Sequence, residues 1–539
     1  MWPVSIGAKA ILSVLIQAVP VLLRVLLVVC SAAASAQESD VTQTPNAIGA
    51  GIQKSLEEQI GAGRGDLFTP DSSRFLIARD PFRAIARGRQ LFQRKFTHAQ
   101  GSGPRTDDGE GDIASDASIV AGFTDSCAAC HGRPHGAAGS GGDVFTHPDS
   151  RDAPHLFGLG LQEMLADEIT QDLRATRDAA LNSAGRRGAP VRVRLRSKRI
   201  DYGWLTVHPD GYVDSSEIQG IDANLRVKPF FAEGSAFSIR QFVVGAFNNE
   251  MGLEAADPDL LAASRGDRVV TPSSMVLDGT TDDLDPPPVS SPSEDGDGDG
   301  VVDEVDPALV DYLEFYLLNY FRPGRYEPYP IISRRGRRIF EQIGCTSCHM
   351  PNFEIEGDRR VADVATKYDP GQPGFNGLFA TARPRFQTVE DHALLPPLRR
   401  PAERRFRVRD IFTDFRRHDL GPNFWERNFD GTLQREFMTE PLWGVATTAP
   451  YGHDGRSVNL REVILRHGGE AQGARDGFAA LSDSAQLELF EFLRSLVLFP
   501  PPDTASNLDP GDPTHPDYPQ SHHGSIALGA LFNDPSDKE

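Results

Sequence analysis

The chain has 539 residues, 39% of them hydrophobic, and a formal net charge of −21, a composition typical of a soluble globular protein with two or three domains. The excess of acidic residues would repel a nucleic-acid backbone, so nucleic-acid binding is excluded from the expected functions. Five cysteines are too few for a disulfide-stabilised scaffold.

Residues 1–36 have the features of an export signal. They contain no acidic residue, an apolar run that ends at Cys30, and small residues at Ala34–Ala36 that suit a cleavage site. An uncleaved membrane anchor is the alternative, but Arg24 interrupts the run. A lipid anchor at Cys30 is disfavoured because Val29, rather than a small residue, precedes it. We therefore expect a periplasmic protein with no stable membrane span after signal cleavage.

The spacing of apolar residues predicts most of the regular structure beyond the signal. One β-like segment is expected where Val191, Val193 and Leu195 alternate with arginines, followed by a hairpin turn at 208–211. The expected fold is therefore mainly α with a small β-hairpin insertion. Helices are predicted in the order 84–96, 159–181, 238–251, 307–321, 336–344 and 482–498.

All four cysteines beyond the signal lie in two copies of one motif. The copies are Cys127-Ala-Ala-Cys130-His131 and Cys345-Thr-Ser-Cys348-His349. Cys-x-x-Cys-His is the attachment signature of c-type haem, in which the two thiols bond to the haem and the neighbouring imidazole binds the iron. Two copies in an exported chain predict two covalently bound c-type haems.

The distance between the two motifs predicts two cytochrome-c-like helical haem domains rather than one. We place the N-terminal haem domain at 37–282 and the C-terminal cytochrome c domain at 331–499. Between them, 283–330 forms a Pro-rich and acidic linker that includes one helix, and 500–539 forms a flexible tail.

The linker also carries the spacing of a calcium-binding loop. Calcium prefers six or more oxygen ligands, which alternating carboxylates around a tight turn at Gly300 can provide. The expected ligands, at loop positions 1, 3, 5, 7, 9 and 12, are Asp295, Asp297, Asp299, Val301 (through its carbonyl), Asp303 and Asp306. Position 12 is Asp rather than Glu and no helix precedes the loop, so it resembles dockerin or thrombospondin-type loops. A solvated acidic linker is the alternative.

The second axial ligand of each haem is open from spacing alone. For the first haem, His147 lies in a Gly-rich loop and can fold over the distal face, whereas His135 is too near the motif. For the second haem the candidates are His392, His418, His453, His467 and Met438.

Several segments resemble one family of known proteins. Pro441–Arg456, which contains Gly-His-Asp-Gly, resembles a segment of bacterial di-haem cytochrome c peroxidases. A related branch, the di-haem oxidoreductases described as peroxidases or "thiol oxidoreductases", is the closer likeness, although nothing in these residues supports the thiol label. Its hallmarks are Phe157–Glu163, Ala246–Gly252, His418–Gly421 and Ile464–Glu470. The resemblance covers roughly residues 80–180, 235–255 and 335–498.

The resemblance implies specific roles for several residues. The family's distal Met of the second haem corresponds to His467, so this haem would be held by His349 and His467, while His147 corresponds to the distal ligand of the first haem. Glu250 would move the protons of the peroxide above the first haem, with Glu163 as the reserve candidate. The resemblance also makes His453 a structural loop residue. Trp443 could lie near the second haem and help electrons to hop, although a buried Trp is more often part of a core.

The implied activity is reduction of hydrogen peroxide at the N-terminal haem, with electrons relayed through the C-terminal haem from a small soluble electron-transfer protein. Such a donor would be basic, because the chain is acidic. Histidine in place of methionine should lower the potential of the second haem. Two alternatives therefore stay open: a di-haem electron-transfer cytochrome without substrate turnover, and an oxidant of an organic or protein substrate.

Overall fold

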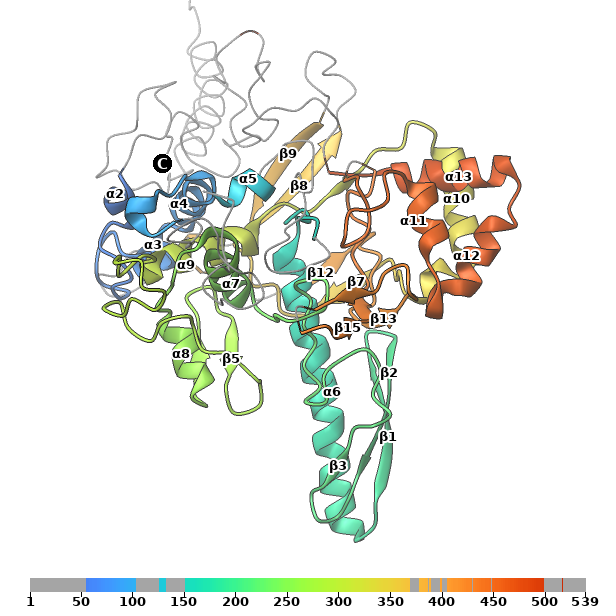
Figure 1. Ribbon diagram of the computed structural model, residues 1–539, viewed down its shortest axis with the longest axis horizontal. Coiled ribbons are helices and arrows are strands. Elements are labelled where there is room, and N and C mark those ends of the chain that lie inside the picture. The colour runs from blue at the N-terminus through green and yellow to red at the C-terminus, as the bar shows by residue number, and fades with distance from the viewer. Residues whose placement is uncertain are drawn as a thin grey trace, which may run out of the picture.

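The computed structural model describes residues 55–102, 126–131, 151–368, 378–385, 387–388, 398–399, 405–428, 430–446, 448–498 and 516. The export signal, His135, His147, His392 and nearly all of the tail lie outside these ranges. Within them, no helix combines the length and apolar character needed to cross a bilayer. The elements form an N-terminal helical part, a long projecting arm and a C-terminal helical part (Figure 1).

Helix α9 is the centre of the N-terminal part. It packs against α3, α4, α6 and α7, and all of its apolar side chains are buried. At Gly88, α4 approaches α9 so closely that a Cβ atom would lie 2.3 Å from the carbonyl oxygen of Tyr312. The bounds are α2 Leu56–Ile60, α3 Ser73–Arg79, α4 Pro81–Gln93, α5 Cys127–His131, α7 Ile239–Met251, α8 Pro258–Ser264 and α9 Pro307–Asn319, with β4 Arg268–Val270 paired to β5 Val276–Asp278.

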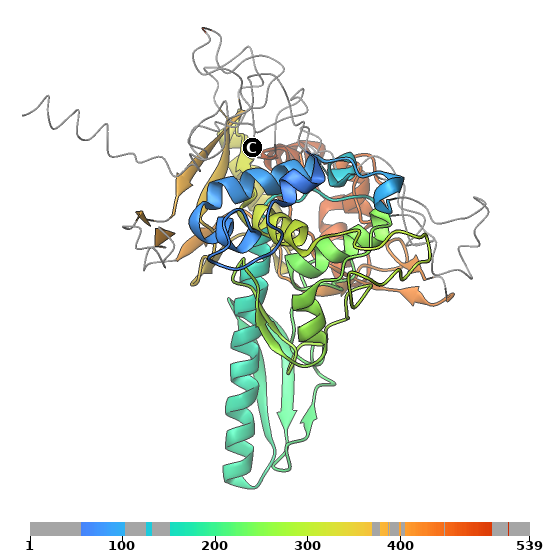
Figure 2. The ribbon, with the colours of Figure 1, turned by 90° about the vertical axis from the view of Figure 1, so that its left-hand side faces the viewer.

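The arm consists of α6 (Leu159–Arg187) and an antiparallel sheet of β1 (Val191–Ser197), β2 (Ile200–Val207) and β3 (Val213–Asp214). It projects from the body in both ribbon views (Figures 1 and 2). Inward-facing residues of α6 and the sheet form a hydrophobic core distinct from that of the N-terminal helices. The predicted strand and turn are confirmed: β1 begins at Val191, and residues 208–211 connect β2 to β3.

The C-terminal part is built on the pair α10 and α13. At Gly336 a Cβ atom would lie 1.9 Å from the carbonyl oxygen of Glu488, so this residue permits the close contact of the two helices. A third hydrophobic core includes Phe340, Phe412 and Phe492. The bounds are α10 Pro330–Gln342, α11 Leu460–Arg466, α12 Gln472–Ala479 and α13 Asp483–Arg494.

Short antiparallel ribbons lie along the chain between Gly324 and Val497, so the described fold is mixed rather than mainly α. Apart from the seven-residue strands β8 and β9, these strands have two or three residues, too few for alternation to predict them. The pairs are β6 Gly324–Arg325 with β17 Leu496–Val497, β7 Phe353–Ile355 with β12 Phe406–Val408, β8 Ala362–Tyr368 with β9 Leu378–Pro384, β10 Gln387–Thr388 with β11 Leu398–Arg399, β13 Arg417–Asp419 with β16 Glu436–Met438, and β14 Glu426–Arg427 with β15 Leu433–Gln434.

All six helices expected from apolar spacing are present, with ends shifted by a few residues. Parts of the segment 283–330, expected as a linker, pack into the hydrophobic core. Leu284 and Val289 are buried, and α9, which was assigned to that segment, lies in the middle of the N-terminal core. The core therefore includes residues on both sides of the acidic stretch.

Candidate functional site

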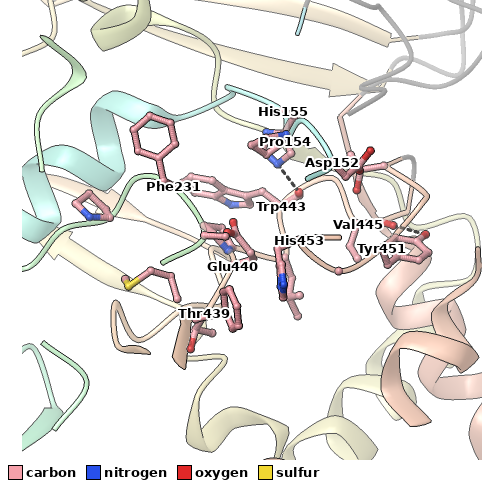
Figure 3. Close-up of a pocket in the computed structure, with 18 of the residues that line it drawn as sticks. Asp152, Pro154, His155, Phe231, Thr439, Glu440, Trp443, Val445, Tyr451 and His453 are labelled. Atoms are coloured by element: carbon pink, nitrogen blue, oxygen red, sulfur yellow. Dashed lines mark hydrogen bonds between the residues drawn. The ribbon is translucent and has the colours of Figure 1, made fainter. Parts of the chain in front are cut away.

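Both Cys-x-x-Cys-His motifs line one cavity of about 1450 Å³ between the N-terminal and C-terminal parts. Residues from α4 and α7 line one side of it, and residues from α11, α12 and α13 line the other. The segment 437–453 adds further lining residues, several of which point into the hollow in Figure 3. Two motifs separated by more than two hundred residues in the chain thus face one shared cavity.

The first motif forms the short helix α5. His131 donates a hydrogen bond from Nδ1 to the carbonyl oxygen of Pro154 at 2.7 Å, and burial lowers the pKa of its imidazole. Because Nδ1 carries the proton, Nε2 has a free lone pair, as a metal-ligating histidine requires. The thiols of Cys127 and Cys130 are free of disulfides, and both residues line the cavity.

The second motif repeats this arrangement. His349 donates from Nδ1 to the carbonyl oxygen of Phe412 at 2.9 Å, and burial lowers its pKa to about 4. Cys345 and Cys348 are free thiols that line the same cavity. The two motif histidines are therefore held in the same tautomer by the same kind of acceptor.

His467 is the C-cap residue of α11 and lines the cavity close to His349, near enough for its charge to lower the pKa of that residue. It donates from Nδ1 to the carbonyl oxygen of Val463 at 2.7 Å, and Phe424 packs edge-on against its ring. This leaves Nε2 of His467 available as a ligand, with its ring orientation fixed by the helix end.

The two carboxylate candidates occupy different surroundings. Glu250 lies in the last turn of α7 and lines the cavity. Glu163, on α6, accepts hydrogen bonds from Arg359 Nη2 at 2.5 Å and from the backbone N–H of Ile239 at 2.8 Å. The carboxylate of Glu163 thus ties α6 to the start of α7, whereas that of Glu250 is placed at the cavity.

Two other candidate ligands have different hydrogen-bonding patterns. Both ring nitrogens of His418 are engaged, Nε2 with Asp414 at 2.9 Å and Nδ1 with Glu470 at 2.8 Å. His453 stacks on Phe437 with ring centroids 3.9 Å apart. Its carbonyl oxygen also accepts the N–H of residue 152. Both residues line the cavity, but only His418 has both ring nitrogens engaged.

The remaining candidates stand as follows. Met438 and Trp443 both line the cavity, and the side chain of Trp443 is buried. His135, His147 and His392 lie outside the described residues.

The structure adds polar residues that the sequence did not single out. Glu440 faces the cavity from the middle of its wall, and burial raises its pKa to about 7 (Figure 3). Next to it, Arg151 pairs with Glu426 at 2.6 Å and with Glu233 at 2.8 Å. Burial, together with the charge of Asp454, raises the pKa of Asp152 to about 7. In the sequence, Glu440 follows Thr439, and Arg151 and Asp152 precede Ala153, and neither place belongs to a recognisable motif. Only the fold shows that these residues lie at the cavity.

The acidic loop 295–306 brings carboxylates together in two overlapping groups. Oxygens of Asp295, Asp297 and Asp299 lie within 4.8 Å of one another, and so do those of Asp297, Glu254 and Glu304. The calcium-loop spacing did not predict these two glutamates. Glu254 lies far before the loop in the chain, and Glu304 lies between the expected ligand positions Asp303 and Asp306.

The later positions of the expected loop are arranged differently. Asp303 adopts a left-handed backbone conformation, with φ of 57°. Asp306 Oδ1 accepts the N–H of Ala308 at 2.7 Å and thereby caps α9. The N-terminal half of the loop therefore has the concentrated carboxylates, and its end begins the central helix.

Residues 402–496 match the family model described as "Di-haem oxidoreductase, putative peroxidase". The match includes His418, Glu440, Trp443, His453 and His467. It confirms the resemblance inferred from the motifs, and it supports a general oxidoreductase class with haem as the cofactor.

No curated protein matches the chain. Among solved structures, it is similar to a chain of Kuenenia stuttgartiensis hydrazine synthase pressurised with 20 bar xenon, at 19% identity and a TM-score of 0.19. The alignment covers 35% of this chain and 56% of that one, so the chain spans about half the length of the matched structure. Similarity at this level carries no argument about function.

Proposed function

We propose that the chain is a periplasmic di-haem c-type oxidoreductase that reduces hydrogen peroxide at its first haem. The observation that carries the proposal is the cavity, into which both Cys-x-x-Cys-His motifs open with their histidine Nδ1 atoms bonded to backbone carbonyls. The family match over 402–496 supports the same class.

The residues present fit two c-type haems. Cys127 with Cys130, and Cys345 with Cys348, offer four thiols that form no disulfide for thioether bonds, and His131 and His349 would each offer Nε2 to an iron. When bound, the haems supply redox-active iron for one-electron transfer and for peroxide binding. The cavity of about 1450 Å³, lined largely by apolar and aromatic side chains, provides a shared volume for both groups.

At the first haem, the carboxylate of Glu250 has the chemistry and the position for proton handling. It can accept a proton from one peroxide oxygen and return it to the departing oxygen. Met251 and Phe247, from the same helix, are buried and limit water on this side of the cavity. His147, which the resemblance assigns as a displaceable ligand here, remains a sequence-based prediction.

At the second haem, His349 and His467 would provide two imidazole ligands. This pair favours electron entry from a small soluble electron-transfer protein over binding of a substrate, because both axial positions would be filled. The acidic surface would steer a basic donor.

The acidic loop is proposed to bind calcium through Asp295, Asp297 and Asp299, with Glu254 and Glu304 as additional ligands, and to brace the start of α9. Chelation should then lower the thermal unfolding temperature, since a ligand at about 100 times its Kd stabilises by roughly 2.7 kcal/mol. Asp297→Asn should abolish the calcium-dependent part of the shift. An unfolding temperature indifferent to both would favour a solvated linker.

A test of the proposed function compares electron paramagnetic resonance and optical spectra of the oxidised and half-reduced holoprotein, with and without hydrogen peroxide. A high-spin first haem that reacts with peroxide is expected. The His349 and His467 pair also suits a plain electron carrier, the second candidate. Two low-spin signals that ignore peroxide in both states would favour the carrier and overturn the peroxidase.

A further inference from the structure

A chain of hydrogen bonds and covalent bonds begins at His131, the histidine of the first motif, and leads through His155 to Trp443. His131 Nδ1 donates to the carbonyl oxygen of Pro154 at 2.7 Å, and that carbonyl is bonded directly to the backbone nitrogen of His155. The ring of His155 accepts the N–H of Phe157 at Nδ1, at 3.2 Å. Nε2 of His155 therefore carries the proton and donates it to the carbonyl oxygen of Trp443 at 2.9 Å (Figure 3).

From Trp443 two branches reach the acceptor of the second motif histidine. Through the backbone, the N–H of Leu442 donates to the carbonyl oxygen of Ile411 at 3.0 Å. Through the side chain, Trp443 Nε1 donates to the carbonyl oxygen of Arg409 at 3.1 Å. The next residue after Ile411 is Phe412, whose carbonyl oxygen accepts the bond from His349 Nδ1 at 2.9 Å. The two motif histidines are thus joined by an unbroken path of covalent and hydrogen bonds.

The middle of this path is closely packed. Trp443 is 3% exposed, and a Cβ atom at Gly158 would lie 2.6 Å from its ring, so only glycine fits there. Burial lowers the pKa of His155 to about 4, which keeps its ring neutral near neutral pH. The ring is then held in one tautomer by two hydrogen bonds.

We propose that His155 is a positioning residue that couples the two haem centres electronically through this path. The proposal rests on the proposed function only in that both motifs carry haem. In this transfer one electron would pass from the second haem, held through His349, to the first haem, held through His131, so the second haem would be oxidised and the first haem reduced. Electrons tunnel more readily through bonded atoms and hydrogen bonds than across open space, and hydrogen bonds to the Nδ1 atoms tune each imidazole as a ligand.

The path has a single side-chain link before Trp443 and two parallel branches after it. Between Pro154 and Trp443 the imidazole of His155 is the side-chain link, whereas beyond Trp443 the backbone and indole branches run in parallel. Loss of the His155 donor should therefore slow transfer more than loss of the indole N–H.

The experiment injects one electron per molecule into the oxidised holoprotein by pulse radiolysis and follows its redistribution between the two haem spectra. His155→Leu should slow redistribution at least tenfold. His155→Gln, whose amide can still donate to the carbonyl of Trp443, should stay within a few-fold of the unmodified protein. Trp443→Phe should slow it only a few-fold. Trp425→Phe, which removes an indole bonded to Asp419 Oδ1 instead, is the matched control and should have no effect.

Midpoint potentials and unfolding temperatures are recorded for each variant, and rates are compared at equal driving force. If His155→Leu gives too little holoprotein, His155→Met replaces it, since it has similar length and no donor. A rate within twofold of the unmodified protein for the variant without a donor would overturn the proposal. Equal slowing by Leu and Gln would also overturn it, because packing rather than the hydrogen bond would then be responsible. Peroxide is absent throughout, so failure here is distinct from failure of the peroxidase proposal.

Discussion

The two Cys-x-x-Cys-His motifs are alike in how their own histidines are held, but different residues line the cavity near them. His131 and His349 each donate from Nδ1 to a backbone carbonyl, and each follows a pair of cysteines that line the cavity and form no disulfide. Around the second motif, the cavity wall presents His467 with its ring fixed by Val463. The N-terminal side of the cavity is lined instead by residues of α7, which include Glu250.

This difference suggests a division of labour between two otherwise equal attachment sites. A local five-residue motif can fix the covalent bonds and the proximal ligand, but the second axial position depends on which distant element packs over it. An imidazole there fills the position, whereas a carboxylate leaves it for a substrate and can move protons.

Removal of the thiols of one motif should have the largest effect. Cys127→Ser with Cys130→Ser should leave one haem per chain, because serine forms no thioether, and the haem that remains should keep the six-coordinate spectrum of the second site. Cys345→Ser with Cys348→Ser should give the reverse. Haem content is measured by the pyridine haemochrome assay. Two haems per chain in either double variant would contradict attachment at that motif.

Glu250→Gln should slow peroxide turnover by about 100- to 10,000-fold, the usual contribution of a general acid–base group, while both haem spectra stay unchanged. Glu163→Gln is the matched comparison. It should lower stability instead, because that carboxylate bonds Arg359 and the start of α7. Steady-state kinetics and thermal unfolding separate the two outcomes, and a turnover defect confined to Glu163→Gln would exchange the assignments.

His467→Met should raise the midpoint potential of the second haem by on the order of 100 mV, since axial ligands set haem potentials over roughly 0.8 V. The first haem should be unaffected. Spectroelectrochemical titration gives both potentials. His453→Gln is the control, since His453 stacks on Phe437 as part of the wall. An unchanged potential in His467→Met would remove His467 as a ligand.

The smallest expected effect concerns the buried charges behind the first site. Arg240, fully buried, bonds Asp257, Asp311 and Glu314, and burial raises the pKa of Glu314 to about 7. The folded protein then holds a proton that the unfolded chain releases above about pH 4.5. Stability should therefore fall as pH rises from about 4.5 to 7, by at most about 3 kcal/mol from this group.

Glu314→Gln should reduce that fall, as measured by urea unfolding at pH 5 and pH 8. Glu436→Gln, at an exposed position on β16, should leave it as in the unmodified protein. An equal decline in both variants would show that Glu314 does not retain its proton in the folded state.

The features that the sequence determined are local ones. Each depends on residues within a few positions of one another. Examples are both Cys-x-x-Cys-His motifs, the apolar spacing that predicts helices beginning near Ala84 and Pro307, and the clustered carboxylates of 295–299. Such patterns are readable because helix periodicity and ligand spacing act over short stretches.

Contacts between distant segments follow from the folded structure and cannot be read from any one stretch of the chain. Three contacts join residues far apart in the chain. Both motifs line one cavity, Glu254 lies next to the acidic loop, and His155 bonds to Trp443. Burial was equally invisible: Glu440 is an ordinary acidic residue in the chain, yet its pKa rises to about 7 once the fold encloses it. Long-range packing sets these contacts, and no short window of residues encodes it.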